Sequence, residues 1–132
     1  MRVLHTMIRV VDLERSINFY TQVLKMAILK HKDYLDGKFT LVFVGYPEVE
    51  NGALIELTHN WETKHYQLGN GFGHVAIEVE DIFEVCENAK LWGANVTRAP
   101  APMKFGGEHN IAFLVDPDGY QIELIEKNKI EK

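Results

Sequence analysis

The sequence contains an internal repeat, and this repeat restricts the chain to a fold made of two similar halves. Each half reads as a strand, a helix and then three further strands. A histidine on the first strand of one half, His5, recurs on the first strand of the other as His74. A glutamate on the last strand recurs at nearly the same offset, as Glu56 and Glu123. Such regular spacing predicts a duplicated supersecondary unit.

The first half contains one predicted helix among its strands. Asp12 is a good helix N-cap, and apolar residues follow it at helical spacing until the helix ends near Lys25 or Met26. On the first strand, His5 and Arg9 fall on one face, because side chains alternate along a strand. The predicted strands cover residues 3–11, 27–30, 39–44 and 53–58.

The second half repeats this order after a polar and aromatic linker, residues 59–71. Asp81 caps a helix, and Glu84 stands where a capping box requires an acidic residue. Gly93 is suited to end that helix with a positive φ angle. The predicted strands cover 72–79, 94–97, 111–115 and 120–126, and a loop covers 99–107. The two repeats therefore span about 1–58 and 72–127 of a single 132-residue domain.

The composition excludes several classes of protein. The net charge of −5 offers no basic field for nucleic acid or anionic lipid. No apolar run approaches the ~20 residues that span a bilayer, and the N-terminus has no signal-peptide pattern. Cys86 is the single cysteine, which excludes an intrachain disulfide and suits packing within the second helix. These features fit a cytoplasmic protein.

A turn followed by a strand places a glutamate between apolar neighbours in each half. Residues 116–119 have turn chemistry, and the strand after them contains Ile122, Glu123 and Leu124. Residues 55–57 repeat this Ile-Glu-Leu tripeptide. An edge strand with a solvated glutamate is the simplest explanation of one such tripeptide. Its recurrence, together with a histidine in each half, predicts instead a divalent transition-metal site with two imidazoles and two carboxylates. The other four histidines read as surface residues in loops or at strand ends: His31, His59, His65 and His109.

The chain resembles glyoxalase I of the vicinal oxygen chelate superfamily along essentially its whole length. The resemblance rests on residues 4–10, 15–20, 43–46, 55–61, 73–76 and 116–120, taken together and in this order. It implies an α+β fold in which two βαβββ modules form a cup-shaped mixed sheet. It also implies a homodimer with active sites at the interface, although the linker permits pairing of modules within one chain or between two.

The resemblance assigns roles to individual residues. It implies four metal ligands: His5, Glu56, His74 and Glu123. Glu123 is the expected general base, with Glu56 as its symmetry mate. The expected substrate contacts are Arg9, Asn60, His74 and, in the loop, Lys104. Arg9 lies four residues after His5 and Asn60 four after Glu56, so strand parity puts both on the ligand face.

The implied reaction is the isomerisation of the methylglyoxal–glutathione hemithioacetal to S-D-lactoylglutathione. A proton leaves the carbon next to a carbonyl and returns to the neighbouring carbon through a metal-bound enediolate. The ligand set admits nickel, cobalt, zinc, manganese or iron, and a compact chain with His5 resembles the nickel- or cobalt-activated class. Two positions depart from the pattern of the family. Lys25 stands where family members often have a glycine that ends the first helix, and Asn70 stands where the zinc-type enzymes tend to have an arginine near the thiol substrate.

Three alternatives remain at this stage. A thiol transferase of the same superfamily would leave Glu56 without a role, because it needs three protein ligands. An epimerase of acyl-CoA thioesters would use a similar metal. A metal-free protein that binds a drug has no use for two His–Glu pairs.

Overall fold

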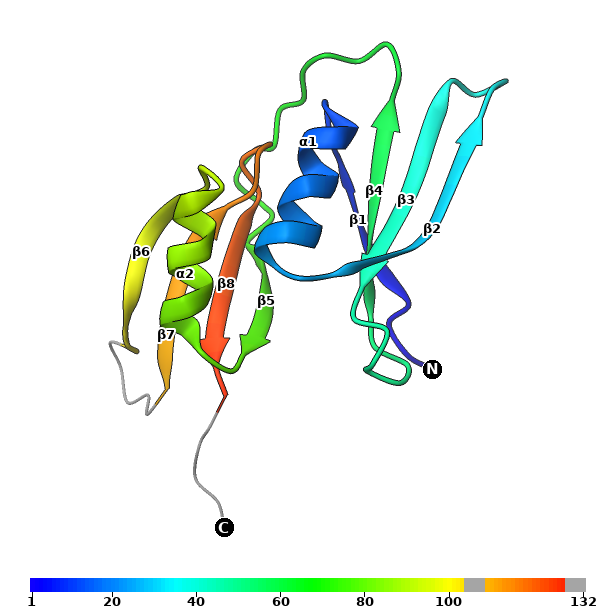
Figure 1. The fold of residues 1–132 in the computed structure, drawn as a ribbon. Helices are drawn as coiled ribbons and strands as arrows, with labels where there is room; N and C mark the ends of the chain where they lie inside the picture. Colours follow the sequence, from blue (N-terminus) through cyan, green and yellow to red (C-terminus); the bar gives the residue numbers. More distant parts are fainter. Residues whose placement is uncertain (104–108, 128–132) are drawn as a thin grey trace. The chain divides into compact units, whose positions relative to one another are not determined.

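The computed structural model describes residues 1–103 and 109–127, and it divides into two compact units, Met1–Gln67 and Leu68–Lys132. Each unit is a four-stranded mixed sheet with helical structure packed on one face (Figure 1). The predicted pair of βαβββ modules is therefore confirmed. No helix within the described residues is long and apolar enough to cross a membrane.

The first unit has its strands in the order β1-β4-β3-β2, with β1 parallel to β4 and the other pairs antiparallel. β4 is therefore an inner strand and β1 an edge strand. The elements are β1 (His5–Arg9), α1 (Leu13–Asn18), the π-helix η1 (Phe19–Val23), β2 (Ala27–Tyr34), β3 (Phe39–Gly45) and β4 (Leu54–Asn60).

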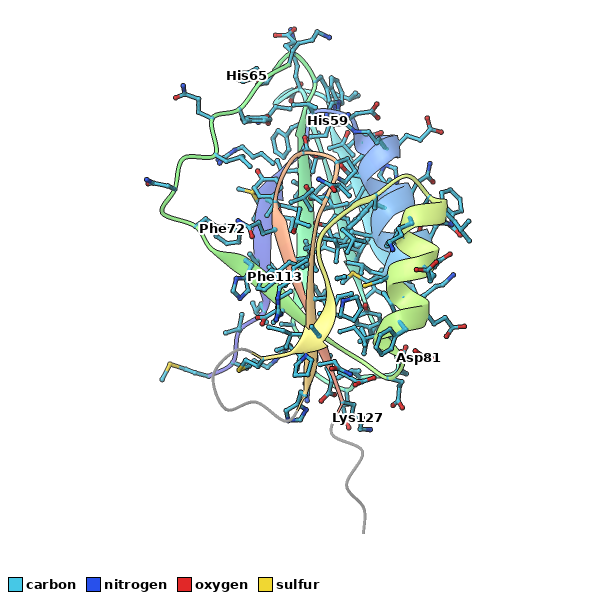
Figure 2. All side chains as sticks on the ribbon, turned by 90° about the vertical axis from the view of Figure 1, so that its left-hand side faces the viewer. His59, His65, Phe72, Asp81, Phe113 and Lys127 are labelled. Atoms are coloured by element: carbon cyan, nitrogen blue, oxygen red, sulfur yellow. The ribbon has the colours of Figure 1, made fainter. Side chains whose placement is uncertain are left out.

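The second unit has the same topology, with strand order β5-β8-β7-β6 and β5 parallel to β8. Asp81 starts its helix by accepting a hydrogen bond from the Glu84 amide at 3.1 Å, as the sequence predicts (Figure 2). The elements are β5 (His74–Val79), α2 (Ile82–Leu91), β6 (Asn95–Pro102), β7 (Asn110–Val115) and β8 (Gln121–Glu126).

One face of each sheet is buried and holds the hydrophobic core. Leu57 on β4 and Leu124 on β8 are fully buried, as are Val42 and Leu114 on the neighbouring strands. Burying such a side chain contributes about 1.5–3 kcal/mol. A slip of one residue would expose the whole apolar set and bury the alternate residues, so the core fixes the strand register.

The glutamate strands are inner strands, which corrects the edge-strand explanation. β4 lies between β1 and β3, and β8 lies between β5 and β7. The sequence did not predict the last residues of the edge strands β2 and β6, which are polar in β2 and contain prolines in β6. β2 continues to Tyr34 rather than Lys30, and β6 continues to Pro102 through residues predicted as a loop. An edge strand tolerates polar residues, bulges and proline, because one of its sides needs no partner strand.

The first helix also differs from the prediction. It is not one α-helix: its second half is a π-helix that ends at Val23, and the Leu24 amide donates to the Phe19 carbonyl at 3.3 Å. The wider turn brings Phe19, Tyr20 and Val23 together on the buried side. β4 continues to Asn60, so the connection between the modules begins two residues later than predicted.

Lys25 adopts a left-handed backbone conformation, which glycine adopts more readily than other residues. Its φ is +60°, whereas the second unit has Gly93 at φ +81° directly after the cap of α2. A side chain in the left-handed region costs about 1–2 kcal/mol, because Cβ approaches the following carbonyl oxygen. The Lys25 side chain is exposed and so does not recover this cost through burial.

Replacing Lys25 by glycine is therefore expected to stabilise the protein. Lys25→Gly should raise the free energy of unfolding by about 1 kcal/mol in a urea titration. Lys25→Ala is the matched control, since it removes the same side chain and charge but keeps Cβ. Equal stability of the two variants would show that φ at this position stores no strain.

Candidate active site

The first unit brings His5 and Glu56 into direct contact. Glu56 on β4 lies opposite Met7 on the parallel strand β1, and His5 precedes Met7 by two residues on the same face. The His5 Nε2 atom lies 2.9 Å from Glu56 Oε1. The Glu56 side chain is only 13% exposed, so the imidazole is its direct partner in a largely buried setting.

The second unit builds the same pair. Glu123 on β8 lies opposite Ala76 on β5, and His74 precedes Ala76 by two residues. The His74 Nε2 atom lies 2.9 Å from Glu123 Oε1, and the Glu123 side chain is 13% exposed. The matched spacing of histidine and glutamate in the two halves of the sequence thus corresponds to one geometry formed twice.

A phenylalanine packs edge-on against each histidine, a contact that the sequence did not suggest on its own. Phe43 on β3 meets the His5 ring with centroids 5.3 Å apart, and Phe113 on β7 meets His74 at 5.4 Å. Figure 2 shows Phe113 on the side of its sheet away from α2. Both phenylalanines pair across the sheet with the glutamates. They recur at nearly the same offset as the histidines, so the repeat would have identified them.

The donor atoms of each pair fit a divalent metal ion. Imidazole nitrogen and carboxylate oxygen bind first-row metals at about 2.0–2.2 Å. Two neighbouring ligands of an octahedral ion are then separated by about 3.0 Å, the metal–ligand distance multiplied by √2. The observed N–O distances of 2.9 Å agree with that edge and also with a hydrogen bond in the absence of metal.

Each unit brings one His–Glu pair together, which offers two candidate metal ligands. Within residues 1–103 and 109–127, no three side chains of the metal-binding types gather into one cluster. A site that needs four protein ligands must therefore combine two pairs.

The first unit also carries the predicted substrate contacts. Arg9 on β1 lies opposite Thr58, two residues beyond Glu56, and Asn60 follows on the same strand. The Asn60 amide donates to the Tyr66 hydroxyl at 2.9 Å, which fixes its orientation. The repeat places Glu78 and Lys127 at the matching positions of the second unit. The two units are thus alike in their His–Glu pairs and different in the residues at these outer positions.

A cavity of about 550 Å³ opens beside His5 in the first unit. Arg2 and Lys30 give it positive charge, and Leu29, Phe43 and other apolar residues line the rest. Tyr46 also lines it and donates from its hydroxyl to the Leu24 carbonyl at 2.6 Å. Burial, with a contribution from Glu48, raises the pKa of Tyr46 to about 12, so this tyrosine stays neutral and structural.

The remaining predicted residues lie apart from the pairs. His31 lies within β2, not in a loop, and His59 lies within β4, where its Nδ1 atom is 3.3 Å from the Val10 carbonyl. His109 Nδ1 is 3.0 Å from the Glu126 carbonyl, and His65 is exposed in the connection between the modules (Figure 2).

Two further predictions concern Cys86 and Lys104. Cys86 is buried in α2, where burial raises the pKa of its thiol, as a packing residue requires. Lys104 lies outside the described residues.

Comparison with known proteins identifies the family of this chain. Residues 2–124 match the model of the glyoxalase/bleomycin resistance protein/dioxygenase superfamily. The chain is 54% identical over 127 residues to the lactoylglutathione lyase of Neisseria meningitidis serogroup A, covering 96% of this chain and 91% of the relative. It is 54% identical to the lactoylglutathione lyase of Salmonella typhimurium, with coverages of 96% and 93%.

A solved structure shows the same fold. Glyoxalase I from Zea mays superposes with a TM-score of 0.91 at 42% identity over 97% of this chain. The alignment covers 45% of the maize chain, so this chain spans about half of that protein. The fold and the paired His–Glu strands define a member of the glyoxalase superfamily. Within that superfamily, the chain belongs to the lactoylglutathione lyases, the glyoxalase I family.

Proposed function

We propose that the chain converts the methylglyoxal–glutathione hemithioacetal to S-D-lactoylglutathione at a divalent metal site made of both His–Glu pairs. This is the activity of the lactoylglutathione lyases, which detoxify methylglyoxal. The observation that carries the proposal is the equality of the two pairs, each with a 2.9 Å contact between imidazole nitrogen and carboxylate oxygen. The ligands would be His5, Glu56, His74 and Glu123.

The bound metal would lower the energy of negative charge that develops on the substrate oxygens. Nickel or cobalt is the favoured ion and zinc is a further candidate, because imidazole and carboxylate together suit all three. The four residues would hold the ion, and the ion would supply Lewis-acid stabilisation to the substrate oxygens.

Glu123 would carry the proton. In the hemithioacetal, the carbon that bears sulfur and hydroxyl lies next to a carbonyl carbon, and its hydrogen is acidified by that carbonyl. The Glu123 carboxylate takes this proton and returns it to the adjacent carbon, while the oxygen-bound proton moves so that the product has a thioester carbonyl and a new hydroxyl. A carboxylate within hydrogen-bond reach of both carbons contributes about 10²–10⁴-fold to such a step.

Arg9 and Asn60 would hold the glutathione part of the substrate. A guanidinium forms paired hydrogen bonds with a carboxylate such as that of a γ-glutamyl group. Both residues lie on the strands that carry His5 and Glu56, so bound glutathione would lie beside the metal. Lys104 would supply a second carboxylate contact, and His74 would contact the substrate as well as the metal.

The two pairs of one site would come from different chains of a homodimer. Each unit presents one pair, and the dimer would thereby hold two complete sites. The thiol transferase and drug-binding alternatives would use at most three of the four ligands. They would therefore leave at least one carboxylate, such as Glu56 at 13% exposure, without a chemical role.

Glu123→Gln tests the assignment of the base. The amide oxygen can still bind metal but cannot carry the proton, so kcat should fall by about 10²–10⁴-fold while much of the metal remains bound. The assay follows thioester absorbance from methylglyoxal and glutathione, with metal measured in the same sample. Glu87→Gln on the exposed face of α2 makes the same charge change away from the site and should keep full activity. A fully active, metal-loaded Glu123→Gln protein would refute the assignment.

Arg9→Ala tests the substrate contact. Loss of a charge-assisted hydrogen bond worth about 2 kcal/mol should raise KM roughly 30-fold, with a small effect on kcat. The melting temperature should change little, because Arg9 lies on the exposed face of an edge strand. An unchanged KM with a large drop in melting temperature would instead assign Arg9 to the fold. Arg15→Ala on the exposed side of α1 is the control for removing a positive charge.

A further inference from the structure

The two site glutamates differ in one contact, although the repeat makes them alike in their exposure and in their histidine partner. Both are 13% exposed, and both lie 2.9 Å from a histidine nitrogen. Of these two glutamates, only Glu56 accepts a hydrogen bond from a hydroxyl group of the described residues. Thr58 Oγ1 donates to Glu56 Oε2 at 2.9 Å. Thr58 can reach this oxygen because it lies two residues further along β4, on the same face.

The second unit has no hydroxyl at the matching position. Ile125 lies two residues beyond Glu123 on β8 and pairs with Glu78, as Thr58 pairs with Arg9 in the first unit. Within the described part of the chain, Glu123 contacts one polar side chain, that of His74, through its Oε1 atom. Its Oε2 therefore remains available to a proton from the substrate.

We propose that Thr58 is a positioning residue that holds Glu56 as a ligand and leaves the proton transfer to Glu123. This inference rests on the proposed function, in which both carboxylates belong to one kind of site. Because the Thr58 hydroxyl donates to Oε2, Glu56 cannot rotate without breaking that hydrogen bond, with or without a metal ion between Oε1 and His5. Glu123 has Ile125 in place of this hydroxyl, so its Oε2 would be able to turn between the two carbons that exchange the proton.

If the Thr58 hydroxyl restrains Glu56, a hydroxyl introduced at the matching position 125 should restrain Glu123 and slow proton transfer. Ile125→Thr adds a hydroxyl beside Glu123 and should lower kcat about fivefold to tenfold with little change in KM, the effect of one hydrogen bond of about 1 kcal/mol or slightly more. Ile125→Val is the matched control, because it has the shape of threonine without the hydroxyl, and it should keep near wild-type kcat.

A second pair of variants tests Thr58 directly. In the Glu123→Gln background, Thr58→Val should raise the residual kcat about fivefold, because Glu56 is then free to accept the proton. Thr58→Ser keeps the donor and should give no such rise. In the otherwise wild-type chain, Thr58→Val should also weaken metal binding, raising the dissociation constant about fivefold in competition with a chelator, whereas Ile125→Val should leave it unchanged.

The outcomes separate this inference from the proposed function. If Glu123→Gln is inactive but neither Ile125→Thr nor Thr58→Val changes kcat as stated, the base assignment stands and the role of Thr58 is wrong. If metal-loaded Glu123→Gln is fully active, the base assignment itself is wrong. Should Thr58→Val fail to fold, Ile125→Thr against Ile125→Val decides the question, because this pair leaves the Thr58 hydrogen bond in place.

Discussion

The site depends on one constraint: side chains alternate along strands whose sheets have one face buried in the core. Because Leu57 and Leu124 must enter the core, the glutamates next to them must point to the opposite face. Burial of Ile8 in the same way turns His5 and Arg9 outward on β1. The free energy of the hydrophobic core thus holds the chemical groups in register. A one-residue shift in strand register would expose the apolar core residues and would also remove the histidines and glutamates from their shared face.

Duplication explains why one module alone would not complete the proposed site. Each copy builds one His–Glu contact of 2.9 Å with a phenylalanine packed edge-on against the histidine, and so would offer two of the four proposed metal ligands. The copies then differ around this shared centre: Arg9, Asn60 and Thr58 have Glu78, Lys127 and Ile125 as counterparts. Under the proposed function, repetition would supply the symmetric ligand set, and the substituted positions would allow one half to bind substrate while the other moves the proton.

The sequence predicted the repeated modules and the helix caps at Asp12 and Asp81. It also predicted that His5 and Arg9 lie on the same face of their strand. All of these follow from local spacing and alternation. It predicted the positive φ at Lys25 only through the family resemblance. It missed the outer half of β2 and the end of β6, since edge strands lack a distinct apolar pattern. It also missed the Thr58–Glu56 hydrogen bond, which distinguishes two glutamates that share the same Ile-Glu-Leu tripeptide.

The most direct test of the account mixes two inactive proteins. His5→Ala and His74→Ala are prepared separately, and each should be crippled at every site. The chains are then refolded together, and formation of the heterodimer is verified. If each site takes one pair from each chain, the heterodimer has one site lacking both histidines and one intact site, so activity should return. If heterodimers form and activity does not return, the two pairs are not shared between chains, and this part of the account is wrong.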